Sequence, residues 1–139
     1  MNESWLTEFK DPYLQSPSGK GVFLAGVLLG FVASCQKGRG SQLNDAPLFK
    51  KLSFGKLQQR DVKRQLGELP MLLKAYNIPY QRQLTELSGQ ASELLLKDDR
   101  QMGVDGNFVF TNAFLNAWKY FYRLFPELEK TDQLKEETA

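Results

Sequence analysis

The sequence predicts an all-α protein, a compact bundle of about five helices around a buried central helix. The stretch from Val22 to Cys35 carries no charge, so as a helix it would be apolar on every side and other helices would have to cover it. Strand-forming residues are scarce, with six Val, one Ile and five Thr among 139 residues. The remaining apolar residues recur at helical spacing, which supports the same fold class.

The apolar stretch is interpreted as a core helix and not as a membrane span. As a helix it would be about 21 Å long, which is shorter than the roughly 30 Å hydrocarbon layer. Gly26 and Gly30 form a GxxxG pattern, which occurs in membrane helix dimers but also permits close helix packing in a soluble core. A secretory signal is not expected, because acidic side chains precede the stretch.

The N-terminal segment is expected to form a short helix that docks on the core. Trp5, Phe9 and Tyr13 recur at i, i+4 and i+8, as on one stripe of a helix. Ser18 is expected to cap the central helix that follows. The sequence SPSGKG in this region lacks the spacing of a nucleotide-binding phosphate loop, so a capped turn is the preferred interpretation.

A helix expected over residues 60–76 has an apolar side and a basic side. At 100° per residue, its cations fall opposite its core residues, which are Val62, Leu66, Leu69, Leu73 and Tyr76. Pro70 is expected to kink or break this helix near residues 67–69, because proline disrupts a helix interior.

Two further helices and a polar loop are expected after Pro79. The first helix has an apolar stripe made of Tyr80, Leu84, Leu87, Ala91, Leu94 and Leu95. Residues 98–107 are expected to be a polar loop. The aromatic segment 108–125 then forms one helix whose inward stripe is Phe110, Phe114, Trp118 and Phe121. Residues 1–125 are therefore predicted to be a single domain, and residues 126–139 a frayed polar tail.

Positive charge is concentrated in the middle of the chain. From Lys37 to Arg82 there are ten basic and three acidic side chains, a net charge of +7, although the whole chain carries only +2. A solvated surface is the usual explanation of such charge, and a phosphate-binding surface is the functional one. The candidate nucleic-acid-binding residues are Lys37, Arg39, Lys50, Lys51, Lys56, Arg60, Lys63, Arg64, Lys119 and Arg123.

The sequence contains few residues of the types that enzymes use for catalysis. The chain has no histidine and a single cysteine, Cys35, so it lacks the commonest general base and metal ligand and cannot form an internal disulfide. The absence of disulfides favours a reducing cytoplasm. The one carboxylate cluster, Asp98, Asp99 and Asp105, does not fit the EF-hand pattern and is expected to be a surface turn. We predict no catalytic residue, metal or cofactor, and a metal-dependent nuclease remains the enzymatic alternative.

Several segments together carry a resemblance to a known family. They are FLAGVLLGFVASCQ, a basic loop, PLFKKLSF, a leucine-rich helix ending in KAYN, and the aromatic helix NFVFTNAFLNAW. Over roughly residues 20–125 they resemble the C-terminal helical region of the large subunit of the type I-B CRISPR Cascade complex. In such systems this region is also translated separately, from an internal start, as the small subunit. A chain of this size that begins with methionine resembles that product. The related type I-D small subunit is an equally similar alternative.

The resemblance implies a compact helical bundle without catalytic residues, present in more than one copy in a crRNA-guided complex for antiviral defence. Its implied partners are the Cascade backbone and large subunits, other copies of itself, the crRNA complex and the target DNA, above all the displaced strand. A cytoplasmic location and no membrane partner are expected. A helical adaptor that makes only protein contacts is the alternative, because the same core would serve it.

Overall fold

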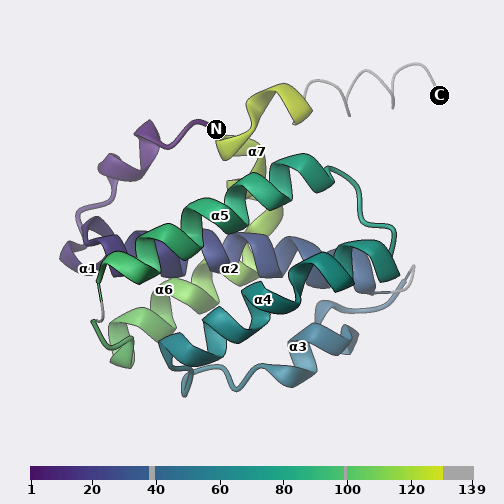
Figure 1. Ribbon diagram of the computed structural model, residues 1–139, viewed down its shortest axis with the longest axis horizontal. Coiled ribbons are helices and arrows are strands. Elements are labelled where there is room, and N and C mark those ends of the chain that lie inside the picture. Colours follow the sequence, from purple (N-terminus) through teal and green to yellow (C-terminus); the bar gives the residue numbers. More distant parts are fainter. Residues whose placement is uncertain (38–39, 99, 130–139) are drawn as a thin grey trace.

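The computed structural model describes residues 1–37, 40–98 and 100–129, and these residues form helices and connecting loops with no strand (Figure 1). Two short 3-10 helices, η1 and η2, span Ser4–Glu8 and Leu43–Asp45. The α-helices are α1 (Pro12–Gln15), α2 (Pro17–Gln36), α3 (Pro47–Lys51), α4 (Gln59–Ala75), α5 (Gln81–Lys97), α6 (Gly103–Leu115) and α7 (Ala117–Leu124). The predicted all-α bundle is confirmed.

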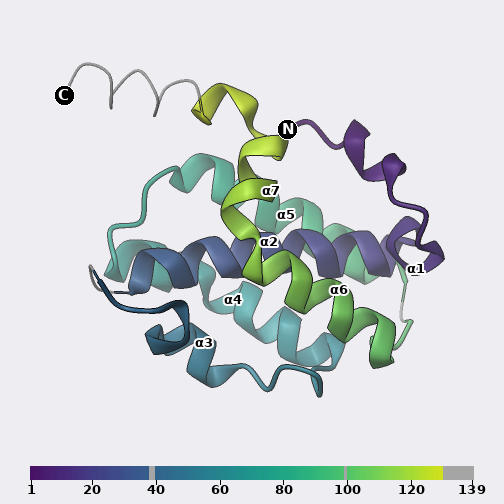
Figure 2. The ribbon, with the colours of Figure 1, turned by 180° about the vertical axis from the view of Figure 1, so that it is seen from behind.

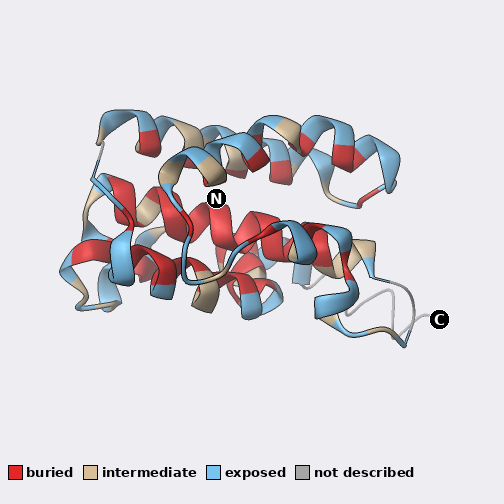
Figure 3. Cartoon of the chain, turned by 90° about the horizontal axis from the view of Figure 1, so that it is seen from below, coloured by how far each residue is buried: buried red, intermediate tan, exposed pale blue. Residues whose placement is uncertain are grey.

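The helices are arranged in layers around α2. α4 and α5 lie on one side of it, and α6 and α7 lie on the other, as the front and back views show (Figures 1 and 2). α1 packs at the beginning of α2, and α3 packs against α2 as well. Buried residues gather on the sides of the helices that face one another (Figure 3). The core therefore follows α2 along its length.

The central position predicted for the apolar stretch is confirmed. Every residue from Gly21 to Ala33 is buried. The helix begins five residues earlier than the apolar stretch, so its 20 residues are about 30 Å long and length alone does not separate it from a membrane span. By length and composition α2 could cross a membrane, but 83% of its most apolar window is buried within the protein.

The two glycines of the GxxxG pattern permit a close crossing between α2 and α6. A Cβ atom added at Gly26 would lie 2.8 Å from the Phe110 carbonyl oxygen and 2.8 Å from the Ala113 Cβ. At Gly30 it would lie 2.7 Å from the Ala117 Cβ and closer still to the Phe114 carbonyl oxygen. These atoms leave no room for a side chain, so the glycines serve packing within this bundle.

The N-terminal segment differs from the single short helix that was predicted. η1 ends at Glu8, and α1 begins only at Pro12, because a residue that precedes proline is disfavoured in the helical region. Trp5 and Tyr13 are nevertheless buried, as expected of a stripe that docks on the core. The prediction that Ser18 caps α2 was wrong: the Ser16 hydroxyl accepts from the Gly19 N–H, and Pro17 occupies the first helical position.

A kink or a break was expected near residues 67–69, and there is no break: α4 continues through Pro70. Pro70 is exposed, whereas Leu66, Leu69 and Leu73 on the opposite side are buried as predicted. Burying each leucine is worth about 1.5–3 kcal/mol, which offsets the roughly 3 kcal/mol cost of an internal proline. Tyr76 was wrongly placed in the core: the helix ends at Ala75, and Tyr76 is 43% exposed.

The apolar stripe predicted for α5 is confirmed. Four of its members are fully buried, and Tyr80 and Leu94 pack at the edge of the core. The fully buried members are Leu84, Leu87, Ala91 and Leu95.

The region after α5 is more helical than predicted, and its aromatic helix is divided. α6 begins at Gly103, so the last five residues of the predicted polar loop are helical. α6 ends at Leu115, and a break at Asn116 changes the register of α7. Trp118 is therefore 40% exposed instead of buried, and Tyr120 takes an inward position.

The boundary of the predicted tail lies close to the end of the described chain. Phe125 and Leu128 are buried against the core, so the packed domain reaches at least Leu128. Most of the predicted tail, residues 130–139, lies outside the described residues.

Candidate nucleic-acid interface

The segment between α3 and α4 is anchored in the core and presents a lysine outward. Leu52 and Leu57 are buried, and the chain turns between them, with the Lys56 N–H donating to the Ser53 carbonyl at 2.9 Å. Gly55 has a φ of +87°, which a residue with a side chain rarely adopts. The turn leaves Lys56 exposed beside the beginning of α4.

Gln59, the first residue of α4, ties three segments of the chain together. Its side-chain amide donates to the Ser18 hydroxyl at 3.1 Å and to the Arg100 carbonyl at 2.9 Å. The Ser18 hydroxyl in turn donates to the Asp98 carbonyl at 2.8 Å. These bonds hold the beginnings of α2 and α4 against the loop before α6, and they bring Arg100 to the basic end of α4.

Asn107 on α6 binds the backbone on the other side of the same region. Its Oδ1 accepts from the Leu57 N–H at 2.8 Å, and its Nδ2 donates to the Leu57 carbonyl at 3.0 Å. Asn107 is buried, so its amide satisfies backbone groups that water does not reach. The Lys56 turn and α6 are thus fixed relative to each other.

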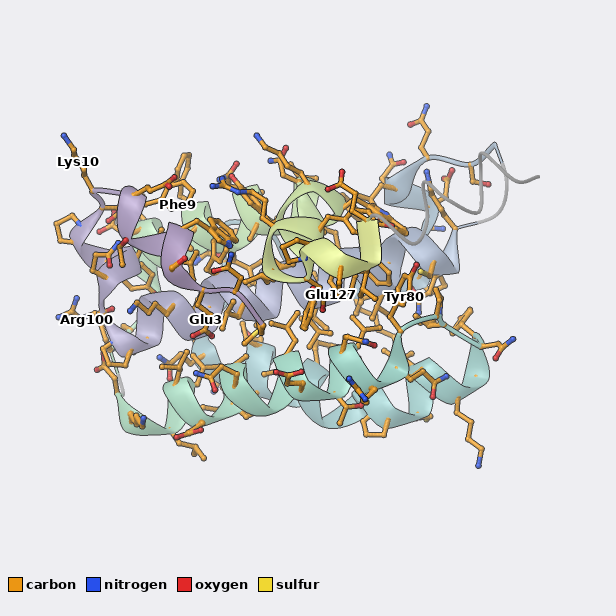
Figure 4. The ribbon with its side chains drawn as sticks, turned by 90° about the horizontal axis from the view of Figure 1, so that it is seen from above. Glu3, Phe9, Lys10, Tyr80, Arg100 and Glu127 are labelled. Carbon is orange, nitrogen blue, oxygen red and sulfur yellow. The ribbon has the colours of Figure 1, made fainter. Side chains whose placement is uncertain are left out.

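A groove of about 680 Å³ lies between these segments, and we name it the α4–α6 groove. Its lining consists of residues 55–60, Lys63, residues 100–104 and Asn107. Four of these residues are cations, Lys56, Arg60, Lys63 and Arg100, and the described lining includes no carboxylate. Figure 4 shows Arg100 at the end of the molecule that also carries Lys10. Such a groove attracts anions, because its charges are of one sign.

A second hollow of about 310 Å³, named the α3–α4 groove, adjoins the first at Lys56 and Leu57. It is lined by residues 51–53, Lys56, Leu57, Asp61, Arg64 and Gln65. The one carboxylate of its described lining, Asp61, accepts from the Gln58 N–H at 2.8 Å and so caps the beginning of α4. The two grooves form a continuous basic surface along the first half of α4.

The cations of the two grooves are not consumed by ion pairs within the described chain. These cations are Lys51, Lys56, Arg60, Lys63, Arg64 and Arg100. None of their side-chain nitrogen atoms lies within 4.0 Å of a described carboxylate oxygen. The described ion pairs involve other residues, such as Lys97 with Glu93 at 3.4 Å. The groove cations are therefore available to a ligand.

The structure brings together only part of the predicted set. Lys50 is exposed on α3 but lines neither groove. Lys37 follows the end of α2, about 30 Å from the beginning of that helix, where Gln59 binds Ser18. Arg39 lies outside the described residues.

Lys119 and Arg123 lie on α7, on the side of α2 away from α4 (Figures 1 and 2). The Arg123 guanidinium lies 4.2 Å from the centre of the Trp5 ring, and its Nη2 is 3.4 Å from Glu8 Oε2. Arg123 thus helps to attach η1 to α7. Neither residue belongs to the surface formed by the two grooves.

Sequence reasoning missed Arg100 and the positioning residues Gln59 and Asn107. Arg100 has no local pattern that marks it, because it meets α4 only through contacts about forty positions apart, such as Gln59 with Arg100. Asn107 had a signal: extending the inward stripe of Phe110 and Phe114 back by one turn places Gly106 and Asn107 inside.

The carboxylates considered for a metal site have separate surroundings. Ser18 lowers the pKa of Asp98 through its side chain and through its backbone N–H, which donates to Asp98 Oδ2 at 3.4 Å. Asp105 is exposed on the first turn of α6, and Asp99 lies outside the described residues. Among the residues described, no three His, Cys, Asp or Glu side chains are grouped to hold a metal ion.

Comparison with known proteins identifies a family. No curated protein and no solved structure matches the chain. A family model described as the C-terminal domain of CRISPR-associated protein TM1802 matches residues 2–115. The match ends at the last residue of α6, so it includes both grooves and excludes α7. Its extent, well over half of the 139 residues, shows that the chain belongs to the family of CRISPR-associated protein TM1802 C-terminal domains.

Proposed function

We propose that this chain is a non-catalytic small subunit of a crRNA-guided CRISPR surveillance complex, of type I-B or the similar type I-D. The family supports a role in CRISPR defence, and its name refers to the C-terminal domain of a protein. That name agrees with the resemblance of residues 20–125 to the C-terminal region of a large subunit. In this role the chain would act in the cytoplasm, in contact with the backbone and large subunits and with other copies of itself.

The observation that carries the proposed activity is the continuous basic surface of the α4–α6 and α3–α4 grooves. Six cations line it, and a single carboxylate, already engaged as a helix cap, belongs to its described lining. Lysine and arginine neutralise phosphates without reading bases. The chain would therefore hold the target DNA, above all the displaced strand, independently of sequence, while guide pairing supplies the specificity.

A helical adaptor that contacts only proteins is the second candidate. The exposed apolar residues on α6 and α7 favour it, since Leu115 is 56% and Trp118 40% exposed next to the buried core. Exposed apolar side chains that lie close together are typical of protein contacts. The two functions are distinguished by the presence of nucleic acid in the assembly.

Co-purification tests the proposal. The tagged chain is expressed together with its neighbouring genes and a CRISPR array, purified, and examined for bound protein and RNA. We expect crRNA and several CRISPR-associated proteins in a complex that binds target DNA less tightly as salt increases. An assembly that contains the chain but no RNA, and that does not bind DNA at any salt concentration, would favour the adaptor. A tagged chain with reversed charges at Lys10 and Lys74, both outside the grooves, is the control.

A further inference from the structure

Phe108 differs from every other phenylalanine of the chain. Its side chain is 70% exposed. The other nine phenylalanines each pack against another aromatic ring, whereas Phe108 meets none among the described residues. Phe108 also borders a hollow of about 200 Å³ that Phe9, Leu14 and Val109 line, so the ring lies at the surface and leaves most of its area open to a ligand.

Phe108 is held beside the α4–α6 groove by a well-anchored turn of α6. Val104, one turn earlier on the same side of the helix, lines the groove, and the two Cβ atoms of such a pair lie about 5–6 Å apart. Asn107 fixes this turn to the Leu57 backbone, and Val109 and Phe110 are buried. The ring is therefore presented from a rigid helix next to the groove that contains four cations.

We propose that Phe108 stacks on a base of a single-stranded nucleic acid whose phosphates lie in the α4–α6 groove. The inference rests on the proposed function and specifies its ligand: a single strand with accessible base faces. Charge complementarity selects a polyanion, because the described lining has four cations and no carboxylate. The exposed ring favours a single-stranded ligand over a duplex, because a base within a duplex is already stacked on its neighbours.

The other occupant of this side of α6 would be a protein. Leu115 is exposed on the same side of the helix, about 10 Å beyond Phe108 along its axis, and is therefore farther from Val104, the groove residue next to Phe108. A protein partner that covers the apolar side of α6 would use both residues, whereas a strand in the groove would use only Phe108. Leu115 is thus a matched control.

The test measures binding of the full chain to a labelled oligothymidine of about 16 nucleotides, the upper end of common site sizes. Phe108→Ala and Phe108→Leu are expected to weaken binding about 5- to 150-fold, the range for one stacked base, and Phe108→Trp to preserve it. The affinity of Leu115→Ala for the oligothymidine should stay within about twofold of that of the unchanged chain. The salt dependence should keep its slope in the Phe108 variants, because the same phosphates remain neutralised by the groove cations.

Four results would overturn the inference. The first is an unchanged affinity in Phe108→Ala. The second is full retention of the affinity in Phe108→Leu, since leucine is apolar but cannot stack. The third is no measurable binding of the single strand by the unchanged chain. Loss of protein assembly in both Phe108→Ala and Leu115→Ala, with oligonucleotide binding unchanged, would also overturn it and identify a protein occupant. If Lys56→Gln still flattens the salt dependence, the proposed function stands without the stacking.

A cross-linking measurement does not depend on variants. Single strands that carry 5-bromouracil are irradiated with the unchanged chain, and the modified peptide is sequenced. Attachment within residues 104–108 is expected. Attachment confined to α7 or to the end of α2 would contradict the placement of the strand.

Discussion

The Asn107 amide pairs with both backbone groups of Leu57, through hydrogen bonds of 2.8 and 3.0 Å. The Nδ2 group also donates to the Gly103 carbonyl at 2.8 Å, within the first turn of α6. One side chain thus connects the turn that carries Lys56 with the helix that carries Phe108. Residues of both segments line the α4–α6 groove: Lys56 and Leu57 from the turn, and Gly103, Val104 and Asn107 from the helix.

Asn107→Ala is expected to lower the free energy of unfolding by about 1–3 kcal/mol, because two buried backbone groups of Leu57 lose their partners. Nucleic-acid affinity should also fall, because the Lys56 turn is no longer fixed to α6. Urea denaturation and oligonucleotide titration measure the two effects. Asn44→Ala, at an exposed site, is the control, and a loss no larger than in this control would contradict the role of Asn107.

Gly30→Ala is expected to destabilise the protein by about 1–3 kcal/mol or more, because the added methyl group overlaps backbone of α6 and forces the helices apart. Gly67→Ala in α4 is the matched control, since a Cβ atom there meets nothing within 4 Å. That change should stabilise the helix by up to about 1 kcal/mol. Thermal unfolding followed by circular dichroism compares the two variants. Equal melting temperatures would show that α2 and α6 do not need the close crossing.

Leu28→Asp is expected to prevent cooperative folding. Leu28 is completely buried in α2, and an unpaired buried carboxylate costs several kcal/mol against a total stability of about 5–15 kcal/mol. Leu96→Asp is the control, because that leucine is 78% exposed on α5. A Leu28→Asp variant that melts cooperatively, like Leu96→Asp, would contradict the central position of α2.

The stability of the protein should decline in alkaline solution because of Tyr13. Burial raises the pKa of Tyr13 from 10.0 to about 12, and its buried hydroxyl has no hydrogen-bond partner among the described residues. Above pH 10 the unfolded chain releases this proton before the folded chain does, so unfolding becomes more favourable as pH rises from 10 to 12. Tyr13→Phe should leave stability at pH 7 equal or higher and make the decline shallower.

Urea denaturation at several pH values measures this effect. Tyr76→Phe, at an exposed position, is the control for the loss of a tyrosine hydroxyl. Burial also raises the pKa of Cys35 from 9.0 to about 11, so some decline persists in Tyr13→Phe. An identical decline in the unchanged chain and in Tyr13→Phe would contradict the assignment.

Features that depend on one continuous pattern could be predicted from the sequence. The stretch Val22–Cys35 has no polar face, so its burial follows from composition, and the opposed cations and leucines of α4 follow from helical geometry. Arg60, Lys63 and Arg64 could be identified as candidates for the same reason, and Lys56 from the positive charge concentrated in residues 37–82. Within that helix, the continuity through Pro70 could not be predicted, because tertiary burial overrides the local preference of proline.

Features that depend on contacts between distant segments could not be predicted. Arg100 lines the α4–α6 groove in a segment whose carbonyl accepts from Gln59, and no spacing near Arg100 indicates that bond. Trp118 was misplaced because the break at Asn116 involves neither proline nor glycine, so the helical period was carried across it. Arg123 meets the Trp5 ring, more than a hundred residues away, and no spacing near Arg123 indicates that contact.

The central claim is that the basic surface of the two grooves binds nucleic-acid phosphates. Its most direct test is a charge reversal of Lys56, Arg60, Lys63 and Arg64 to Glu in the assembled complex, with target-DNA affinity measured across a salt series. Reversal of Lys10, Lys74, Arg82 and Lys97, which lie outside the grooves, changes the net charge equally and is the control.

The groove variant should bind more weakly, and its log–log salt dependence should flatten by about 0.7 for each single-strand phosphate that the chain no longer neutralises. The control variant should keep a slope close to that of the unchanged complex. An intact complex in which the groove variant retains both the affinity and the slope would contradict the claim.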